Sequence, residues 1–217
     1  MIPSVIRWPF RLSKQVCVWV MGVCGLGLIL YLSAEDSMSL PGPSLDIIFV
    51  NASPEVEQTG RHVIEVTAAR FQNLTGERIG KVPIRVEVVD DLAAGDLSRT
   101  SSGKIQGVTV YNHSTNSGTI QISSRRSVSF GRILAHEVTH IFVREAFGRA
   151  QNQTLNEGLA EYLAAQEFPS EVKRDLRMAS HGMPSSALKP YVDGFQFCQD
   201  FAEDSQFPAF FQETNLS

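Results

Sequence analysis

Residues 132–147 read RILAHEVTHIFVREAF, and the pentapeptide HEVTH occupies positions 136–140. Positions i and i+4 of an α-helix share one face, so the side chains of His136 and His140 are expected to project side by side. Two imidazole nitrogens at this spacing can bind one metal ion, zinc above all. Glu137 lies about 100° further around the helix, where its carboxylate can reach a water beside the metal without ligating the metal itself.

The helix around this pentapeptide, expected from Val128 to Phe147, is apolar on nearly every side. Three apolar side chains share the histidine face and four cover the opposite one: Ile133, Val143 and Phe147, against Leu134, Val138, Ile141 and Phe142. Such a helix is expected to be buried. Because two histidines and a carboxylate on a buried helix need partners, a metal ion would satisfy them.

A second helix is predicted from Thr154 to Phe168, where NEGLAEY occupies positions 156–162. Glu157 and Glu161 form another i, i+4 pair, opposite a stripe of leucines, which by itself is typical of a solvated face. Sixteen residues separate His140 from Glu157, which leaves room for a short turn and an antiparallel return. Glu157 can then complete a His-His-Glu zinc site whose fourth position stays open to water, as catalytic zinc sites require.

Together, HEVTH and NEGLAEY resemble the motifs of the gluzincin zinc metallopeptidases, especially the compact peptidase-MA-like domains. The resemblance is strongest over residues 132–166 and weaker back to residue 46. It implies one Zn²⁺ per chain. It also implies the roles of four residues, with His136, His140 and Glu157 as zinc ligands and Glu137 as the general base.

The resemblance extends to residues around the zinc site. Gluzincins of the thermolysin type carry an acidic residue four positions after the glutamate ligand, hydrogen-bonded to the first histidine. Glu161 occupies that position, where a carboxylate would fix the imidazole tautomer. In aminopeptidase-like gluzincins, a tyrosine in a Tyr-x-x-Gly stretch stabilises the oxyanion, and Tyr191 with Gly194 fits that pattern. His181 is the rival for this role, and Tyr191 as a packing aromatic is the alternative.

In this family, the strand before the zinc helix is often the edge strand that holds the substrate backbone. The run from Thr119 to Ser123 fits that place, so the predicted substrate-binding residues are Thr119, Ile120, Gln121 and Ile122. Backbone pairing there would make binding largely independent of the substrate's side chains. The alternative is that this run is an ordinary strand of the sheet.

An apolar segment precedes these motifs. Val16–Leu32 contains 17 residues and no charge, at the short limit for a helix that crosses a bilayer. Only basic charges precede it and the first acidic residue follows it, so the positive-inside rule places residues 1–15 in the cytoplasm. Residues 33–45 are then a linker, and residues 46–217 are a peptidase domain outside the cytoplasm. The alternative is a signal peptide cleaved near Ala34, which would release a secreted protein.

Composition and element order bound the fold class. The chain has 217 residues, of which 43 % are apolar and 19 % charged, and this fits one compact domain, alone or with an appendage. Its net charge of −4 argues against a nucleic-acid-binding protein. Strands are predicted at 46–50, 82–89, 105–111 and 119–123, and helices at 54–74, 128–147, 154–168, 170–179 and 191–203. This order predicts an α+β fold, with a small mixed β-sheet packed on a helical zincin-like half after one transmembrane helix.

These expectations combine into a membrane-anchored zinc metallopeptidase that acts on a peptide or protein substrate. Two alternatives stay open. The chain could be a catalytically inactive, membrane-tethered binding or scaffold module on the same fold. The zinc could also be purely structural, although structural sites usually use four protein ligands and favour cysteine, and only Cys198 lies outside the apolar segment.

Overall fold

The computed structural model describes residues 45–90, 92, 107–124, 129–148, 152–182 and 185–202, with positions 207, 209 and 213. All of them belong to one compact unit, Gly42–Ser217. The apolar segment Val16–Leu32, its basic flank and the linker up to residue 44 lie outside the described residues. Among the helices in the described ranges, none combines the length and the apolar character that crossing a bilayer requires.

The described elements form a mixed α+β fold, as the sequence predicts. In chain order they are β1 (Asp46–Val50), α3 (Pro54–Thr75), β2 (Pro83–Val89), β3 (Gly107–Asn112), β4 (Ser117–Ser123), α4 (Phe130–Phe147), α5 (Gln153–Glu167), α6 (Pro169–Gly182) and α7 (Ser185–Phe201). Most boundaries lie within a few residues of the predicted ones. The exception is α7, which begins at Ser185 rather than at Tyr191 and contains Pro190.

Polar caps explain where the helices that carry the site begin. The side chain of Ser129 accepts a hydrogen bond from the backbone N–H of Arg132 and so starts α4. The Asn152 side chain accepts one from the N–H of Leu155, at 3.1 Å, and starts α5. Such caps satisfy backbone donors that the first helical turn leaves free.

The four strands form one sheet in the order β1-β2-β4-β3. β1, β2 and β4 run parallel, and β3 pairs with β4 in the antiparallel direction. In this register Ile120 of β4 lies between Val86 of β2 and Thr109 of β3. The sheet is therefore mixed, and β1 and β3 are its two edge strands.

The predicted position of the substrate strand is wrong in one respect. β4, which contains Thr119, Ile120, Gln121 and Ile122, is an interior strand whose two edges already pair with β2 and β3. Its backbone groups are thus used within the sheet, and the side chains of Ile120 and Ile122 are fully buried. The edge strand on this side is β3.

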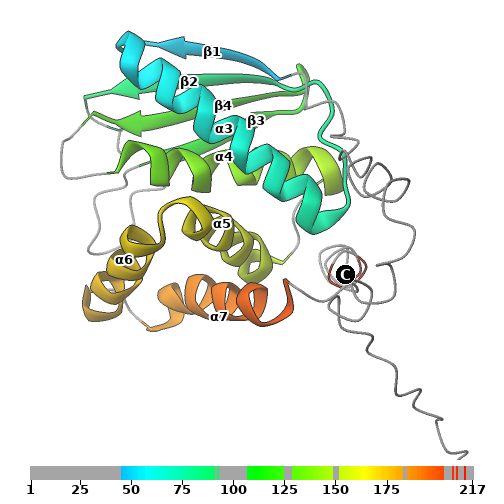
Figure 1. Cartoon of the computed structure of the whole chain (residues 1–217), viewed down its shortest axis with the longest axis vertical. Helices are drawn as coiled ribbons and strands as arrows, with labels where there is room; N and C mark the ends of the chain where they lie inside the picture. Colours follow the sequence, from blue (N-terminus) through cyan, green and yellow to red (C-terminus); the bar gives the residue numbers. More distant parts are fainter. Residues whose placement is uncertain are drawn as a thin grey trace, which may run out of the picture. The chain divides into compact units, whose positions relative to one another are not determined.

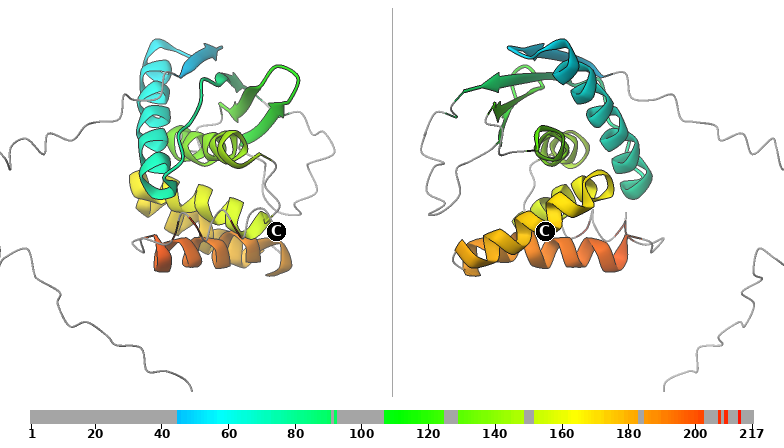
Figure 2. Two further views of the ribbon diagram at one scale, coloured as in Figure 1. Left: turned by 90° about the vertical axis from the view of Figure 1, so that its right-hand side faces the viewer. Right: turned by 60° about the vertical axis from the view of Figure 1, so that its left-hand side comes forward.

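The helix α4 lies at the centre of the fold. α3 and α4 cover one face of the sheet, and α5, α6 and α7 form a further layer beyond α4 (Figure 1). Both views in Figure 2 show α4 between the sheet and the later helices. Leu134, Val138, Ile141 and Phe142 of α4 are completely buried, which confirms the expectation from its apolar surface.

A close crossing of α5 and α7 depends on two glycines. A methyl group placed on Gly194 would lie 2.8 Å from the Cα of Gly158 and would overlap the carbonyl oxygen of Thr154. A methyl group on Gly158 would in turn overlap the backbone of Gly194. Because backbone atoms cannot move aside as a flexible side chain can, only glycine permits this approach. The crossing brings the first half of α7, with Tyr191, close to α4.

Candidate metal centre

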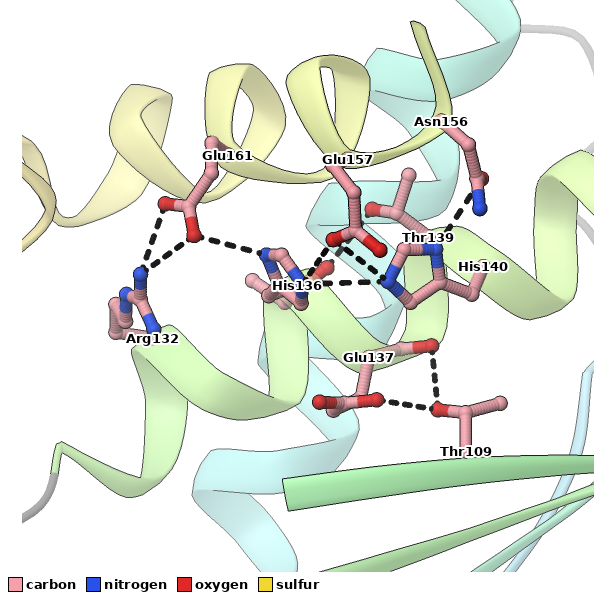
Figure 3. A network of polar contacts seen from close by, with 10 residues as sticks. Thr109, Arg132, His136, Glu137, Thr139, His140, Asn156, Glu157 and Glu161 are labelled. Atoms are coloured by element: carbon pink, nitrogen blue, oxygen red, sulfur yellow. Dashed lines mark hydrogen bonds and ion pairs between the residues drawn. The ribbon is translucent and has the colours of Figure 1, made fainter. Parts of the chain in front are cut away.

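Three potential ligand atoms from two helices converge at one point. His136 and His140 come from α4, and their Nε2 atoms lie 3.2 Å apart. Glu157 comes from the first turns of α5, and its Oε2 lies 3.4 Å from Nε2 of His136 and 3.7 Å from Nε2 of His140. Figure 3 shows the carboxylate of Glu157 above the pair of imidazoles. This group could hold a metal ion, as the sequence predicts.

The distances and the chemistry of the three donors fit a tetrahedral metal. Ligands about 2.0–2.2 Å from a tetrahedral centre lie about 3.3–3.6 Å from one another, close to the separations found here. Two imidazole nitrogens that face each other cannot both present a lone pair without a cation between them. Oε2 of Glu157 is buried and has no hydrogen-bond partner among the described residues. A bound cation would satisfy all three atoms at once.

Two outer residues orient the imidazoles. Nδ1 of His136 lies 3.2 Å from Oε1 of Glu161, and Nδ1 of His140 lies 3.1 Å from Oδ1 of Asn156. With a proton on each Nδ1, both imidazoles turn that N–H away from the centre and an Nε2 lone pair towards it. Partners of this kind fix the tautomer and raise the basicity of ligating histidines. Glu161 thus stands where the resemblance places it.

Arg132, on the same helix as the histidines, holds Glu161 in place. Its Nη2 donates to both carboxylate oxygens of Glu161, at 2.7 and 2.8 Å. The side chains of Arg132 and Glu161 are only 12 % and 3 % exposed. Burial alone would raise the pKa of Glu161, but His136 and Arg132 hold it below its usual range. Glu161 therefore stays ionised inside the protein, as an acceptor for His136 needs to be.

The carboxylates of Glu157 and Glu161 make positive charge favourable at this centre. Burial alone would lower the pKa of His136, yet Glu161 and Glu157 raise it to about 10. Burial would likewise raise the pKa of Glu157, and the two histidines hold it below its usual range. Both carboxylates therefore favour a positive charge at this centre. A divalent cation would supply that charge and pair with the same carboxylates.

The carboxylate of Glu137 points towards the sheet, about 100° around α4 from His136. Its Oε2 accepts a hydrogen bond of 2.7 Å from the hydroxyl of Thr109, which also lies 2.9 Å from the carbonyl oxygen of Glu137 (Figure 3). Thr109 belongs to the edge strand β3. The candidate base is thus positioned by β3, whereas the candidate third ligand, Glu157, comes from α5.

Of the two candidates for oxyanion stabilisation, the structure describes the side chain of Tyr191 but not that of His181. The ring of Tyr191 stacks on that of His136, with a centroid separation of 6.3 Å and an interplanar angle of 16°. Burial, with the nearby carboxylates of Glu157 and Glu161, raises the pKa of Tyr191 well above its usual range, so its hydroxyl keeps its proton. His181 belongs to α6, and its side chain lies outside the described part of the chain.

Three residues of this site are not identified from the sequence: Arg132, Asn156 and Thr109. Arg132 carries a recoverable signal, because it precedes His136 by four positions and so shares its helix face. Asn156 precedes Glu157 directly, but nothing in the sequence pairs it with His140. Thr109 has no signal at all, because its contact with Glu137 depends on the order of strands in the sheet.

No family model, curated protein or solved structure matches this chain. Its function must therefore be inferred from the geometry of this centre.

Removal of the third candidate ligand is expected to weaken metal binding strongly. Wild-type protein reconstituted with zinc should hold about one zinc ion per chain. Glu157→Ala should bind it on the order of a hundredfold more weakly, because it loses a charged ligand inside the site. Elemental analysis after dialysis measures both. Glu167→Ala, on the same helix but paired with Arg70 at the surface, is the matched control. Equal zinc in Glu157→Ala and wild type would show that Glu157 is not a ligand.

Proposed function

We propose that the protein is a zinc-dependent metallopeptidase that hydrolyses peptide bonds with water. One observation carries the proposal: three candidate ligands converge, and Glu137, the residue after His136 on α4, is kept out of the group by its own hydrogen bond to Thr109. Three ligands leave a fourth position for water, which distinguishes catalytic zinc sites from structural ones. The donor set of two imidazoles and one carboxylate suits zinc.

Each residue of the site would have its own role in the hydrolysis of the peptide bond. Zinc, when bound, acts as a Lewis acid that lowers the pKa of a water and polarises the scissile carbonyl. Glu137 takes a proton from the attacking water and later delivers it to the leaving amine. The protonated hydroxyl of Tyr191 donates a hydrogen bond to the oxyanion of the tetrahedral intermediate. Glu161 and Asn156 keep the two imidazoles in the ligating orientation.

We place the substrate backbone along the outer edge of β3 rather than on β4. β3 is an edge strand, and its outer side has no neighbouring strand among the described residues. Thr109 of β3 contacts the candidate base, so a peptide paired with this edge would pass close to Glu137. Backbone pairing with an exposed edge is a common mode of peptide recognition.

The proposal includes attachment to a membrane. Its support is the sequence alone, in which Val16–Leu32 has no charge and follows three basic residues. The peptidase domain would then face away from the cytoplasm, or would be secreted if the segment were cleaved.

The direct test is zinc-dependent hydrolysis of a mixed peptide library by the full-length protein. We expect cleavage products by mass spectrometry, their loss after chelation, and their return when one equivalent of zinc is added. Glu157→Ala protein purified in the same way controls for a contaminating peptidase. If zinc-loaded wild-type protein cleaves no peptide, the proposal fails and the inactive binding module becomes the better interpretation.

A further inference from the structure

The base-bearing face of α4 continues to a second polar group beyond the metal centre. Arg144 follows Glu137 by seven residues, which is 20° short of two full turns at about 100° per residue. The two side chains therefore lie on one stripe of α4, about 10 Å apart along its axis. β3 follows the same stripe, because Thr109 contacts Glu137 and Tyr111 lies beneath Arg144.

Arg144 is held by two rings from the β3–β4 hairpin. Its guanidinium lies over the ring of Tyr111, with 5.8 Å between the guanidinium carbon and the ring centroid. Its Nη2 also contacts the imidazole nitrogens of His113. The rings of Tyr111 and His113 are themselves 5.3 Å apart. Neither ring carries a negative charge, so the contacts with Tyr111 and His113 hold the guanidinium of Arg144 without neutralising it.

The carboxylate of the next residue on α4, Glu145, forms hydrogen bonds with other side chains. Oε2 of Glu145 accepts a hydrogen bond of 3.1 Å from the hydroxyl of Tyr111 and one of 3.3 Å from Nδ2 of Asn116. Within the described ranges, Arg144 forms no ion pair with a carboxylate. Arg144 is partly buried and His113 is exposed, so the guanidinium packs against the two rings and keeps access to solvent. A guanidinium in this setting offers several donors to an anion.

We propose that Arg144, supported by Tyr111 and His113, is a subsite for a carboxylate of the peptide substrate. This inference rests on the proposed function for its ligand class. An extended peptide advances about 3.3 Å per residue, so the distance along α4 from Glu137 to Arg144 corresponds to about three residues. A glutamate or aspartate two or three residues from the scissile bond would reach the guanidinium. A free carboxyl terminus at the same distance offers the same chemistry.

Peptide binding to a variant that does not cleave peptides tests this subsite independently of catalysis. The protein is full-length Glu137→Gln loaded with zinc, and the probes are fluorescein-labelled alanine-rich peptides of one length. One has capped ends and a single Glu, the second has Gln instead, and the third has Gln and a free carboxyl terminus. By fluorescence anisotropy, we expect the Glu peptide to bind about five- to tenfold more tightly than the capped Gln peptide. If the third peptide also binds more tightly than the capped Gln peptide, a free carboxyl terminus can supply the carboxylate that Arg144 binds.

The same comparison in a second variant assigns any preference to Arg144. Adding Arg144→Gln should remove the preference for the carboxylate, and the ratio of affinities cancels any general change in peptide binding. Arg85→Gln removes the same charge from an exposed position on β2, paired with Glu87, and should leave the ratio unchanged. The wild-type preference should also shrink at high salt, because the guanidinium is partly exposed.

Three results would overturn the inference: equal affinity for all three peptides, a preference that survives Arg144→Gln, or the absence of measurable binding by either carboxylate peptide. Failure of the proposed function would look different. In that case wild-type protein would cleave none of the peptides, while Arg144 would still determine the preference for a carboxylate. If wild type is active, cleavage should fall two or three residues from the glutamate.

Discussion

Glu137→Gln is expected to lower kcat for peptide hydrolysis by about a thousandfold and to leave about one zinc ion per chain. Glutamine has nearly the same shape as glutamate, and its amide oxygen can still accept the hydrogen bond from Thr109. It cannot take a proton from water. Because the carboxylate is absent from the candidate ligand group, its replacement should not disturb the three donors. Steady-state kinetics and elemental analysis on one preparation measure both quantities.

The matched control for this experiment is Glu167→Gln, which makes the same chemical change in a surface ion pair with Arg70. It should retain wild-type kcat and zinc. Normal activity in Glu137→Gln would remove Glu137 from the role of base. Loss of zinc together with activity would mean that Glu137 helps to build the metal centre, and the division of roles between β3 and α5 would have to be revised.

The ligand group could be predicted because its signals are local. His136 and His140 are joined by helix periodicity, and Glu157 stands at the start of the next helix after a short turn. Helix geometry and loop length thus limit where these three side chains can be. The α+β class follows from the same reasoning, since the order of strands and helices along the chain leaves few arrangements.

The environment of the site could not be predicted in the same way. On α5, Glu157 and Glu161 face away from the leucine stripe, which taken alone indicates a solvated face. In the structure that face packs on α4 while the leucine side is also covered, so α5 is buried on both sides and its glutamates meet histidines. The periodicity of α5 alone does not identify these carboxylates as site residues, and the tertiary arrangement shows why they are not solvated.

The position of the edge strand is a second feature that the sequence alone does not determine. The family resemblance implies that the run before the zinc helix, Thr119 to Ser123, is the edge strand, with an ordinary strand of the sheet as the alternative. The chain instead inserts β4 between β2 and β3, so the hairpin partner β3 takes the outer position. Strand order depends on which edges pair across the sheet, and alternation within a strand carries no information about it.

Gly194→Ala is expected to lower the free energy of unfolding by about 3 kcal/mol, against the usual effect of this substitution. In an unobstructed helix, alanine is more favourable than glycine by about 1 kcal/mol, so the expected sign is reversed by the crossing with α5. The added methyl group would lie 2.8 Å from the Cα and 3.0 Å from the backbone nitrogen of Gly158. Those atoms belong to the backbone of α5 and cannot rotate away, so α7 must shift outward.

The outward shift of α7 should lower kcat without changing the zinc content. The three candidate ligands come from α4 and α5, so zinc content should stay at about one per chain in a folded Gly194→Ala protein. Tyr191 lies one turn before Gly194 and stacks on His136, and moving α7 would draw its ring away from His136. We therefore expect kcat to fall while zinc is retained. Urea unfolding gives the stability, and kinetics at low temperature gives the activity of the folded fraction.

Gln196→Ala is the control for this last substitution, because residue 196 is exposed on the same helix and its one hydrogen bond within the described ranges is to Asp200, one turn further on. It should change the free energy of unfolding by less than about 0.5 kcal/mol. If Gly194→Ala were instead more stable than wild type, α7 could not cross α5 at this glycine. The stacking of Tyr191 on His136 depends on that crossing, so Tyr191 would then lose its role as the oxyanion donor, while the zinc ligands on α4 and α5 would stand unchanged.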